Sequence, residues 1–257
     1  MIVCKSASEI ERMRVANMLV ADVLHELETL VAPGVTTADL DAAAERLVRA
    51  AGAEPAFKGY RGYPATLCAS INEEVVHGIP SKKRALGDGD IVSLDMGVKL
   101  NGFYGDSAVT VPVGRVSDNV LTLLRVTQEA LELAIAQVRV GGRVSDIGHA
   151  VQRHVEANGF SVVREFVGHG IGSALHEDPQ IANYGEPGRG PRLAEGMVLA
   201  IEPMVNVGRP AVRVLSDNWT AVTKDGSLSA HFEHTVAVTK AGPLVLTQRT
   251  VPAEASR

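Results

Sequence analysis

Two aspartates, Asp95 and Asp106, lie on either side of an Asn-Gly pair. Asn101-Gly102 between two apolar, β-prone runs is a strong hairpin signal, because a two-residue type I′ turn needs positive φ at both central residues. With that turn, Asp95 faces Ala108 and Asp106 faces Gly97. Side chains alternate along a strand, so the two carboxylates share one face as diagonal neighbours, about 7–8 Å apart.

Two acids that point into one space repel each other unless a cation lies between them. Gly97 and Ala108 are small and leave room for such a cation. The alternative is a solvated hairpin face, or acids that cap local turns, and the hairpin alone does not decide between them.

Three further residues could join the aspartates as ligands. His169 lies between two glycines, Glu202 ends an apolar run before Pro203, and Glu233 lies in a predicted strand. Several carboxylates with one imidazole suit divalent Mn, Fe, Co or Zn. Taken singly, each has a simpler interpretation: a turn histidine bonded to backbone, a lone ion pair for the buried glutamate, and an exposed strand position.

Two histidines in loops, His77 and His176, could donate to a substrate carbonyl or shuttle a proton, or could be structural. Cys68 lies in an apolar strand, where a packing thiol is expected more often than a nucleophile. Three aromatic residues could belong either to the core or to a pocket: Tyr60, Tyr63 and Trp219. The remaining histidines that we interpret as structural are His25, His149, His154 and His234.

The elements that must position these groups fall into two similar series. A capping box at Ser6 and Glu9 starts a helix that Pro33-Gly34 ends, with Leu27 and Leu30 on its buried face. A shorter helix runs from Thr37 or Asp39 to Gly52, and a strand covers 66–71.

In the second series a long helix covers about 119–138, with Leu121 and Leu124 on its buried face, and a short helix covers 145–157. Strands are expected at 161–167, 197–202, 211–215, 219–222 and 230–239.

The two series match at a constant offset. The pairs Gly34 and Gly141, Asp39 and Asp146, Gly52 and Gly159, and Gly89 and Gly196 are each 107 positions apart (159 − 52 = 107). The same offset places Asp95 on Glu202. We interpret the chain as two copies of one helix-helix-strand unit, and twofold-like packing would bring these two carboxylates together.

Composition and charge narrow the class of protein. The 257 residues are 46% hydrophobic and 21% charged, which suits one globular α/β domain with halves at about 5–112 and 113–250 and a loose tail at 251–257. The net charge of −5 gives no reason to expect a nucleic-acid or membrane partner. Cys4 and Cys68 are too few for a disulfide framework, and no secretory signal is evident, so we expect a cytoplasmic protein.

Over about residues 5–250 the chain resembles the type I methionine aminopeptidases of bacteria. The matching segments include Gly-His-Gly-Ile-Gly at 168–172 and Phe-Glu-His-Thr at 232–235. The others lie at 59–64, 70–80, 93–97, 105–107, 176–179 and 201–204. The resemblance implies the pita-bread fold, in which two pseudo-symmetric halves surround a curved antiparallel β-sheet.

The resemblance also implies a site and a reaction. Two divalent ions (Co, Mn, Fe, Zn or Ni) would be held by Asp95, Asp106, His169, Glu202 and Glu233. Water between the metals would attack the first peptide bond of a nascent polypeptide whose second residue is small. Glu202 would accept the proton, His176 would steady the oxyanion and His77 would bond the peptide. The methionine pocket would be lined by Phe57, Tyr60, Tyr63, Cys68 and Trp219.

Four residues depart from the family pattern: Phe57, Arg61, Leu175 and His231. They leave the ligand set intact but affect pocket shape and second-residue preference. Two alternatives remain. X-Pro peptidases share the implied fold but usually carry a large extra N-terminal domain, and non-catalytic relatives usually lose ligands. We expect a monomer that meets its substrates at the ribosome exit through the catalytic domain itself.

Overall fold

The predicted hairpin forms the centre of the structure, a computed structural model that describes residues 1–249. β4 (Ile91–Leu100) pairs with β5 (Phe103–Pro112), and Asp95 lies opposite Ala108 as predicted. Asn101 and Gly102 have φ of 52° and 82°, the positive values that a type I′ turn requires. The tail predicted at 251–257 lies outside the described residues.

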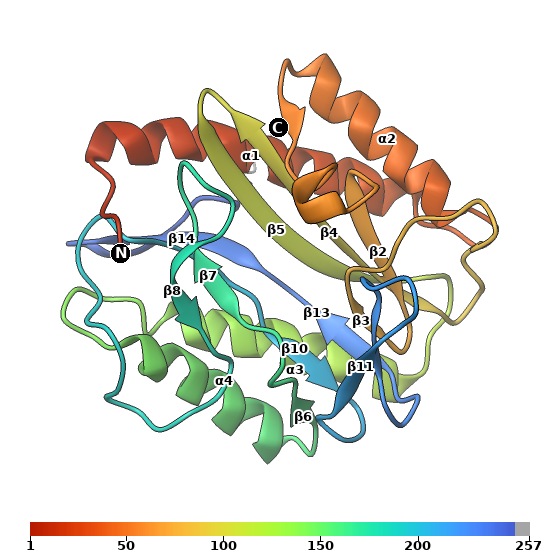
Figure 1. Ribbon diagram of the computed structural model, residues 1–257. Coiled ribbons are helices and arrows are strands. Elements are labelled where there is room, and N and C mark those ends of the chain that lie inside the picture. Colours follow the sequence, from red (N-terminus) through yellow and green to blue (C-terminus); the bar gives the residue numbers. More distant parts are fainter. Residues whose placement is uncertain (250–257) are drawn as a thin grey trace, which may run out of the picture.

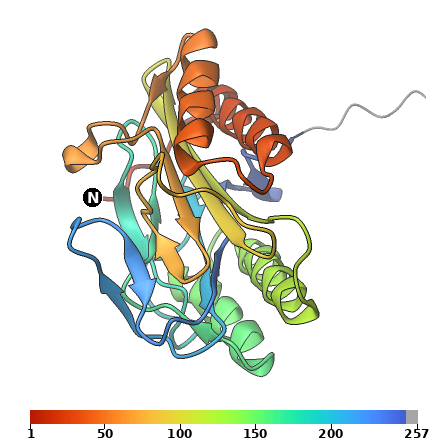
Figure 2. The ribbon, with the colours of Figure 1, turned by 90° about the vertical axis from the view of Figure 1, so that its right-hand side faces the viewer.

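Within residues 1–249, four α-helices cover the strands. They are α1 (Ala7–Leu30), α2 (Thr37–Ala50), α3 (Asp118–Ile135) and α4 (Val144–Ala157). The predicted capping box at Ser6 and Glu9 starts α1. In Figure 1, α1 and α2 lie above the β4–β5 hairpin and α3 and α4 lie below it. Figure 2 shows α1 and α3 on the same side of the strands.

The remaining strands pair only in antiparallel fashion among the described residues. In chain order they are β1 (Glu54–Pro55), β2 (Leu67–Ile71), β3 (Glu74–Val76), β6 (Ser161–Val162), β7 (Gly168–Gly170), β8 (Glu177–Ile181), β9 (Val198–Ile201), β10 (Met204–Asn206), β11 (Val212–Val214), β12 (Ala221–Thr223), β13 (Ser229–His231), β14 (His234–Thr239) and β15 (Gly242–Val245). One sheet has the order β1-β4-β2 with β5 paired to β4, and another has the order β15-β14-β9-β7-β8.

The sequence repeat is also a structural repeat. α2 and α4 begin at Thr37 and Val144 and are both 14 residues long, and β1 and β6 keep the same offset of 107 (144 − 37 = 107). The isolated bridge Thr36–Ala85 has its counterpart in Arg143–Arg192. These matches confirm that the two halves are pseudo-symmetric.

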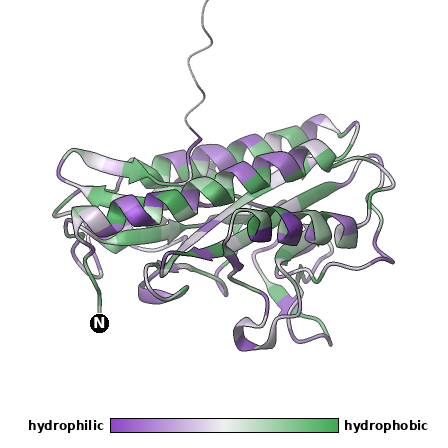
Figure 3. Ribbon diagram, turned by 90° about the horizontal axis from the view of Figure 1, so that it is seen from above, coloured by the Kyte–Doolittle hydropathy of each residue, from purple (hydrophilic) through white to green (hydrophobic). Residues whose placement is uncertain are grey.

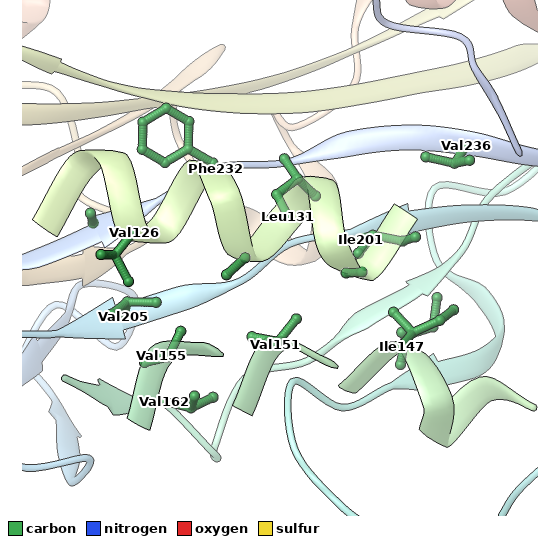
Figure 4. Packing of buried hydrophobic residues seen from close by; sticks show 14 of the residues in the cluster. Val126, Leu131, Ile147, Val151, Val155, Val162, Ile201, Val205, Phe232 and Val236 are labelled. Atoms are coloured by element: carbon green, nitrogen blue, oxygen red, sulfur yellow. The ribbon is translucent and has the colours of Figure 1, made fainter. Parts of the chain in front are cut away.

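The two largest apolar clusters each draw mainly on one half, and smaller clusters join residues of both halves. One of the two largest joins α1 and α2 to β2 and β4, and the other joins α3 and α4 to β9 and β10. Figure 4 shows the second cluster, where Val155 of α4 lies near Val205. Along the long helices the hydropathy in Figure 3 alternates, as expected for helices that bury one side.

Two strand predictions are wrong in extent. The strand expected at 161–167 covers only Ser161–Val162, and the one expected at 230–239 is interrupted at 232–233. Two core predictions are wrong as well: Leu30 and Leu121 are 43% and 49% exposed, while Leu27 and Leu124 are buried.

Candidate functional site

The five predicted ligands line a single cavity of about 160 Å³: Asp95, Asp106, His169, Glu202 and Glu233. They come from both halves of the chain. The aspartates lie in β4 and β5, the histidine in β7, and the glutamates directly after β9 and between β13 and β14. The structure therefore brings together every residue of the predicted set.

A row of paired backbone positions explains why the acids meet. Asp95 lies opposite Cys68 on one side and Ala108 on the other, and Ala108 forms an isolated bridge with Glu233. Paired residues on adjacent antiparallel strands project to the same face. The small side chain of Ala108 thus separates Asp95 from Glu233, as expected for a site with space between acids.

Gly97 does not serve the purpose that we predicted for it. A Cβ at Gly97 would lie 2.9 Å from the Phe57 ring and 3.1 Å from Cβ of Ala56. The space above this glycine is therefore filled by the side chain of Phe57, which also lines the cavity.

His169 is held close to the acids with a defined tautomer. Its Nδ1 lies 2.9 Å from the carbonyl oxygen of Gly170, which can only accept, so Nδ1 carries the hydrogen. Nε2 is then the free ligand atom, 3.9 Å from Asp106 Oδ2 and 3.7 Å from Glu202 Oε1. Ligand atoms of Asp106, His169 and Glu233 all lie within 4.8 Å of one another.

The glycine before His169 permits this approach. A Cβ at Gly168 would lie 2.3 Å from the carbonyl oxygen of Ala200, so a larger residue would force β7 away from β9. His169 pairs with Ala200 across the same strands, two positions before Glu202. The glycine therefore sets the separation of His169 and Glu202.

The electrostatics of the cavity favour a cation. Burial raises the pKa of Asp95 to about 7, and burial together with the neighbouring acids raises the pKa values of Asp106, Glu202 and Glu233 well above their usual range. Buried oxygens of Asp95, Asp106 and Glu233 have no hydrogen-bond partner among the described residues. Unpartnered carboxylate oxygens with a neutral imidazole are the donor set of a divalent metal site, so these residues fit metal ions.

The two predicted catalytic histidines lie in the same cavity wall. His176 Nδ1 is 2.8 Å from the Tyr60 hydroxyl, and its ring centroid is 4.2 Å from that of His169. His77 has a φ of 61° and packs edge-on against Trp219 and Phe166. Burial lowers the pKa of both histidines to about 4, so both rings are neutral at pH 7.

The wall beside these histidines is apolar and aromatic. All five residues predicted to bind the side chain line it: Phe57, Tyr60, Tyr63, Cys68 and Trp219. The Tyr63 hydroxyl lies 3.0 Å from the carbonyl oxygens of both Leu67 and Gly78 and donates its one hydrogen between them, which fixes its ring. Burial raises the pKa of the Cys68 thiol well above its usual range, so Cys68 is a packing thiol rather than a nucleophile.

One polar residue beside the acids, His231, was predicted only to affect pocket shape and second-residue preference. His231 is 1% exposed, and Nε2 lies 3.7 Å from Glu202 Oε2. Neither ring nitrogen has a hydrogen-bond partner among residues 1–249. Burial lowers its pKa to about 3, so the ring is neutral. His231 lies two residues before Glu233 in the predicted strand, so the two side chains share one face, and this spacing was the sequence signal that His231 lies beside the acids.

Comparison with known proteins agrees with this site. Residues 11–240 match metallopeptidase family M24, and the chain belongs to this family of metal-dependent hydrolases. A methionine aminopeptidase of Clostridium acetobutylicum is 53% identical over 96% of this chain and 99% of its own. Methionine aminopeptidase 1 of Bacillus subtilis is 54% identical over 96% of this chain and 100% of its own.

Solved structures of methionine aminopeptidases are also similar to this chain. Methionine aminopeptidase from Thermotoga maritima superposes with a TM-score of 0.95 at 49% identity, covering 97% of this chain and 100% of its own. Xaa-Pro dipeptidase from Bacillus anthracis has a TM-score of 0.78 at 22% identity and shares the fold, while this chain covers 62% of it. Within residues 1–249, no helix has both the length and the apolar character needed to cross a bilayer.

Proposed function

We propose that this enzyme removes the N-terminal methionine of nascent proteins whose second residue is small, using two divalent ions. The observation that carries the proposal is the convergence of five ligand side chains from both halves beside an aromatic pocket. Relatives about 50% identical over nearly the whole chain carry the name of this activity. Asp95, Asp106, His169, Glu202 and Glu233 would hold the ions.

The chain's own residues support this chemistry as follows. The ions, when bound, would polarise the peptide carbonyl and lower the pKa of a bound water. Glu202 would accept a proton from water, because its carboxylate lines the cavity and its pKa is raised by burial and by Asp95 and Asp106. With the Tyr60 hydroxyl donating to Nδ1, His176 carries its hydrogen on Nε2 and can donate to a developing oxyanion.

The aromatic wall would select the substrate. An unbranched thioether packs favourably against aromatic rings, so Phe57, Tyr60, Tyr63 and Trp219, with Cys68, would bind a methionine side chain. His77, whose neutral ring packs against Trp219, would form a hydrogen bond with the peptide that follows the methionine. We further propose that the enzyme is a cytoplasmic monomer that meets its substrates where they leave the ribosome.

Two peptides and one substitution test the proposal. Met-Ala-Ser should be cleaved faster than Ala-Pro-Ala, and the reverse order would identify an X-Pro peptidase instead. Glu202→Gln should abolish turnover while the protein stays folded. The matched control is Glu195→Gln, because Glu195 is exposed and pairs only with Lys240 in the described chain. Equal activity of the Glu202→Gln variant and the parent would overturn the proposed mechanism.

The number and kind of ions need a separate experiment. Metal-free protein titrated with Co²⁺, Mn²⁺, Fe²⁺, Zn²⁺ or Ni²⁺ in turn should bind two equivalents, measured by calorimetry. One equivalent at saturation for every metal would reject the two-ion site. Activity restored by each metal at its own saturation would then rank the metals.

A further inference from the structure

The N-terminal arm contains a buried charge that the mechanism above does not use. Lys5 is 8% exposed, although lysine is rarely buried without a partner. Its Nζ lies 2.5 Å from Glu177 Oε2, and the two side chains are 5% and 10% exposed. Its backbone N–H donates to the carbonyl oxygen of Gly196, which fixes the arm to the body of the protein.

Glu177 connects this ion pair to the loop that carries His176. Its other oxygen, Oε1, accepts a hydrogen bond from the N–H of Ala174, so the carboxylate spans the chain immediately around His176. Glu177 also begins β8, which pairs with β7. The ammonium of Lys5 thus holds a carboxylate that closes the loop between β7 and β8.

The fit around the lysine is close. A Cβ added at Gly172 would lie 2.4 Å from Cε of Lys5 and 2.6 Å from Oε1 of Glu177. The carbonyl oxygen of Gly172 accepts from Tyr104 in β5, so the start of the loop is fixed to the central hairpin. The loop is therefore held at both ends, and the Lys5–Glu177 pair holds the end that carries the histidine.

We propose that Lys5 is a positioning residue for His176, acting through Glu177. Loss of the ammonium leaves a buried carboxylate without its partner, and Glu177 would turn toward water and release Ala174. His176 would then lose its position relative to the substrate carbonyl. The proposed ligands lie outside residues 171–177, and His169 is also held by its pairing with Ala200 of β9, so metal binding should be unaffected.

The test is a double-mutant cycle, and it rests on the proposed function because it uses cleavage of Met-Ala-Ser. Lys5→Met keeps the aliphatic stem and removes the charge. It should lower kcat about tenfold or more, because a displacement of about 1 Å can cost up to about 100-fold. KM and calorimetric metal affinity should change less than about twofold. In a His176→Ala background, Lys5→Met should have no further effect, since both changes remove the same contribution.

Controls separate the possible failures. Arg14→Met removes an exposed cation paired with Glu11 and should leave kcat unchanged. If Lys5→Met does not fold, Glu177→Gln replaces it in both backgrounds. An equal loss with and without His176, or no loss in the parent, would overturn the role of Lys5. If the parent enzyme fails to cleave Met-Ala-Ser, the proposed function is rejected. The role of the ion pair is then tested by NMR, in which the ring signals of His176 should shift in the Lys5→Met variant.

Discussion

Asp95 and Glu202 are equivalent residues of the two halves (202 − 95 = 107), and both line the same cavity. β4 and β9 begin at equivalent positions, Ile91 and Val198, so the two acids follow equivalent strand starts. Each half thus contributes one carboxylate by the same local route. The other proposed ligands, Asp106, His169 and Glu233, are not related in this way.

Removal of metal should make stability depend on pH above neutrality. In the metal-free protein, burial raises the pKa of Asp95 to about 7 from an ordinary 3.8, and burial with the neighbouring acids raises the pKa values of Asp106, Glu202 and Glu233 well above their ordinary range. The folded state then holds protons that the unfolded chain has lost, so stability falls as pH rises. Each such proton contributes a slope of about 1.4 kcal/mol per pH unit.

Histidines oppose this trend only at lower pH. His77, His169 and His176 have pKa values of about 4 against 6.5, so they add stability as pH rises from about 4 to 6.5. Above pH 6.5 the carboxyls act alone. Thermal unfolding of metal-free protein should therefore show a falling Tm from pH 6.5 to 8, and saturating metal should remove the fall. A rising Tm in that range without metal would contradict the assignment.

His231 should matter through the hydrogen-bonding capacity of its ring. His231→Leu would leave Glu202 Oε2 without the polar neighbour that lies 3.7 Å away. We expect at least a tenfold loss in metal affinity or kcat, the usual cost of losing a group that orients a metal ligand. His231→Gln, which keeps a donor, should retain most of both. The control His149→Leu removes a histidine bonded to Gly185 away from the cavity.

The glycine beside His169 provides a test of backbone approach. Gly168→Ala should destabilise the protein by more than about 2 kcal/mol and lower metal stoichiometry, because its Cβ would meet the Ala200 carbonyl oxygen at 2.3 Å. Gly52→Ala is the control, since it has a positive φ but nothing within 4 Å. It should cost only about 1 kcal/mol from backbone strain. Equal effects in urea unfolding would disprove the close-approach argument.

Phe57 should set the size of the side-chain pocket. Its ring fills the space above Gly97, so Phe57→Ala should enlarge the pocket. The ratio of kcat/KM for an N-terminal ethionine peptide over the methionine peptide should rise, by roughly 10-fold for one extra methylene. Phe160→Ala, which opens the core of the other half, should lower stability without changing this ratio. An unchanged ratio in the Phe57→Ala variant would show that Phe57 does not determine the selectivity of the pocket.

The local parts of this site were accessible from the sequence. Asn101-Gly102 determined the register of β4 and β5, and a register determines which side chains share a face. The 107-residue offset then related Asp95 to Glu202 before any contact was known. Both inferences need only short-range geometry and periodicity.

Contacts between distant segments were not accessible in this way. The space above Gly97 is filled by Phe57, which lies 40 positions earlier in the chain (97 − 57 = 40). The residues next to Gly97 in the sequence do not indicate this contact. The break at 232–233 arises because Glu233 bridges Ala108. On α3, Val120 and Leu121 are both apolar, and only the packed structure shows that Val120 is buried and Leu121 exposed.

The division of the proposed ligands between the two halves of the chain would give bound metal a second effect. Asp95 and Asp106 lie in the first half of the chain, and His169, Glu202 and Glu233 lie in the second, with residues 113–117 linking β5 to α3. An ion held by side chains of both halves would resist separation of the halves. It would therefore stabilise their association in addition to taking part in the reaction. A chain cut within this link should therefore reassemble from its two fragments more tightly when divalent metal is present.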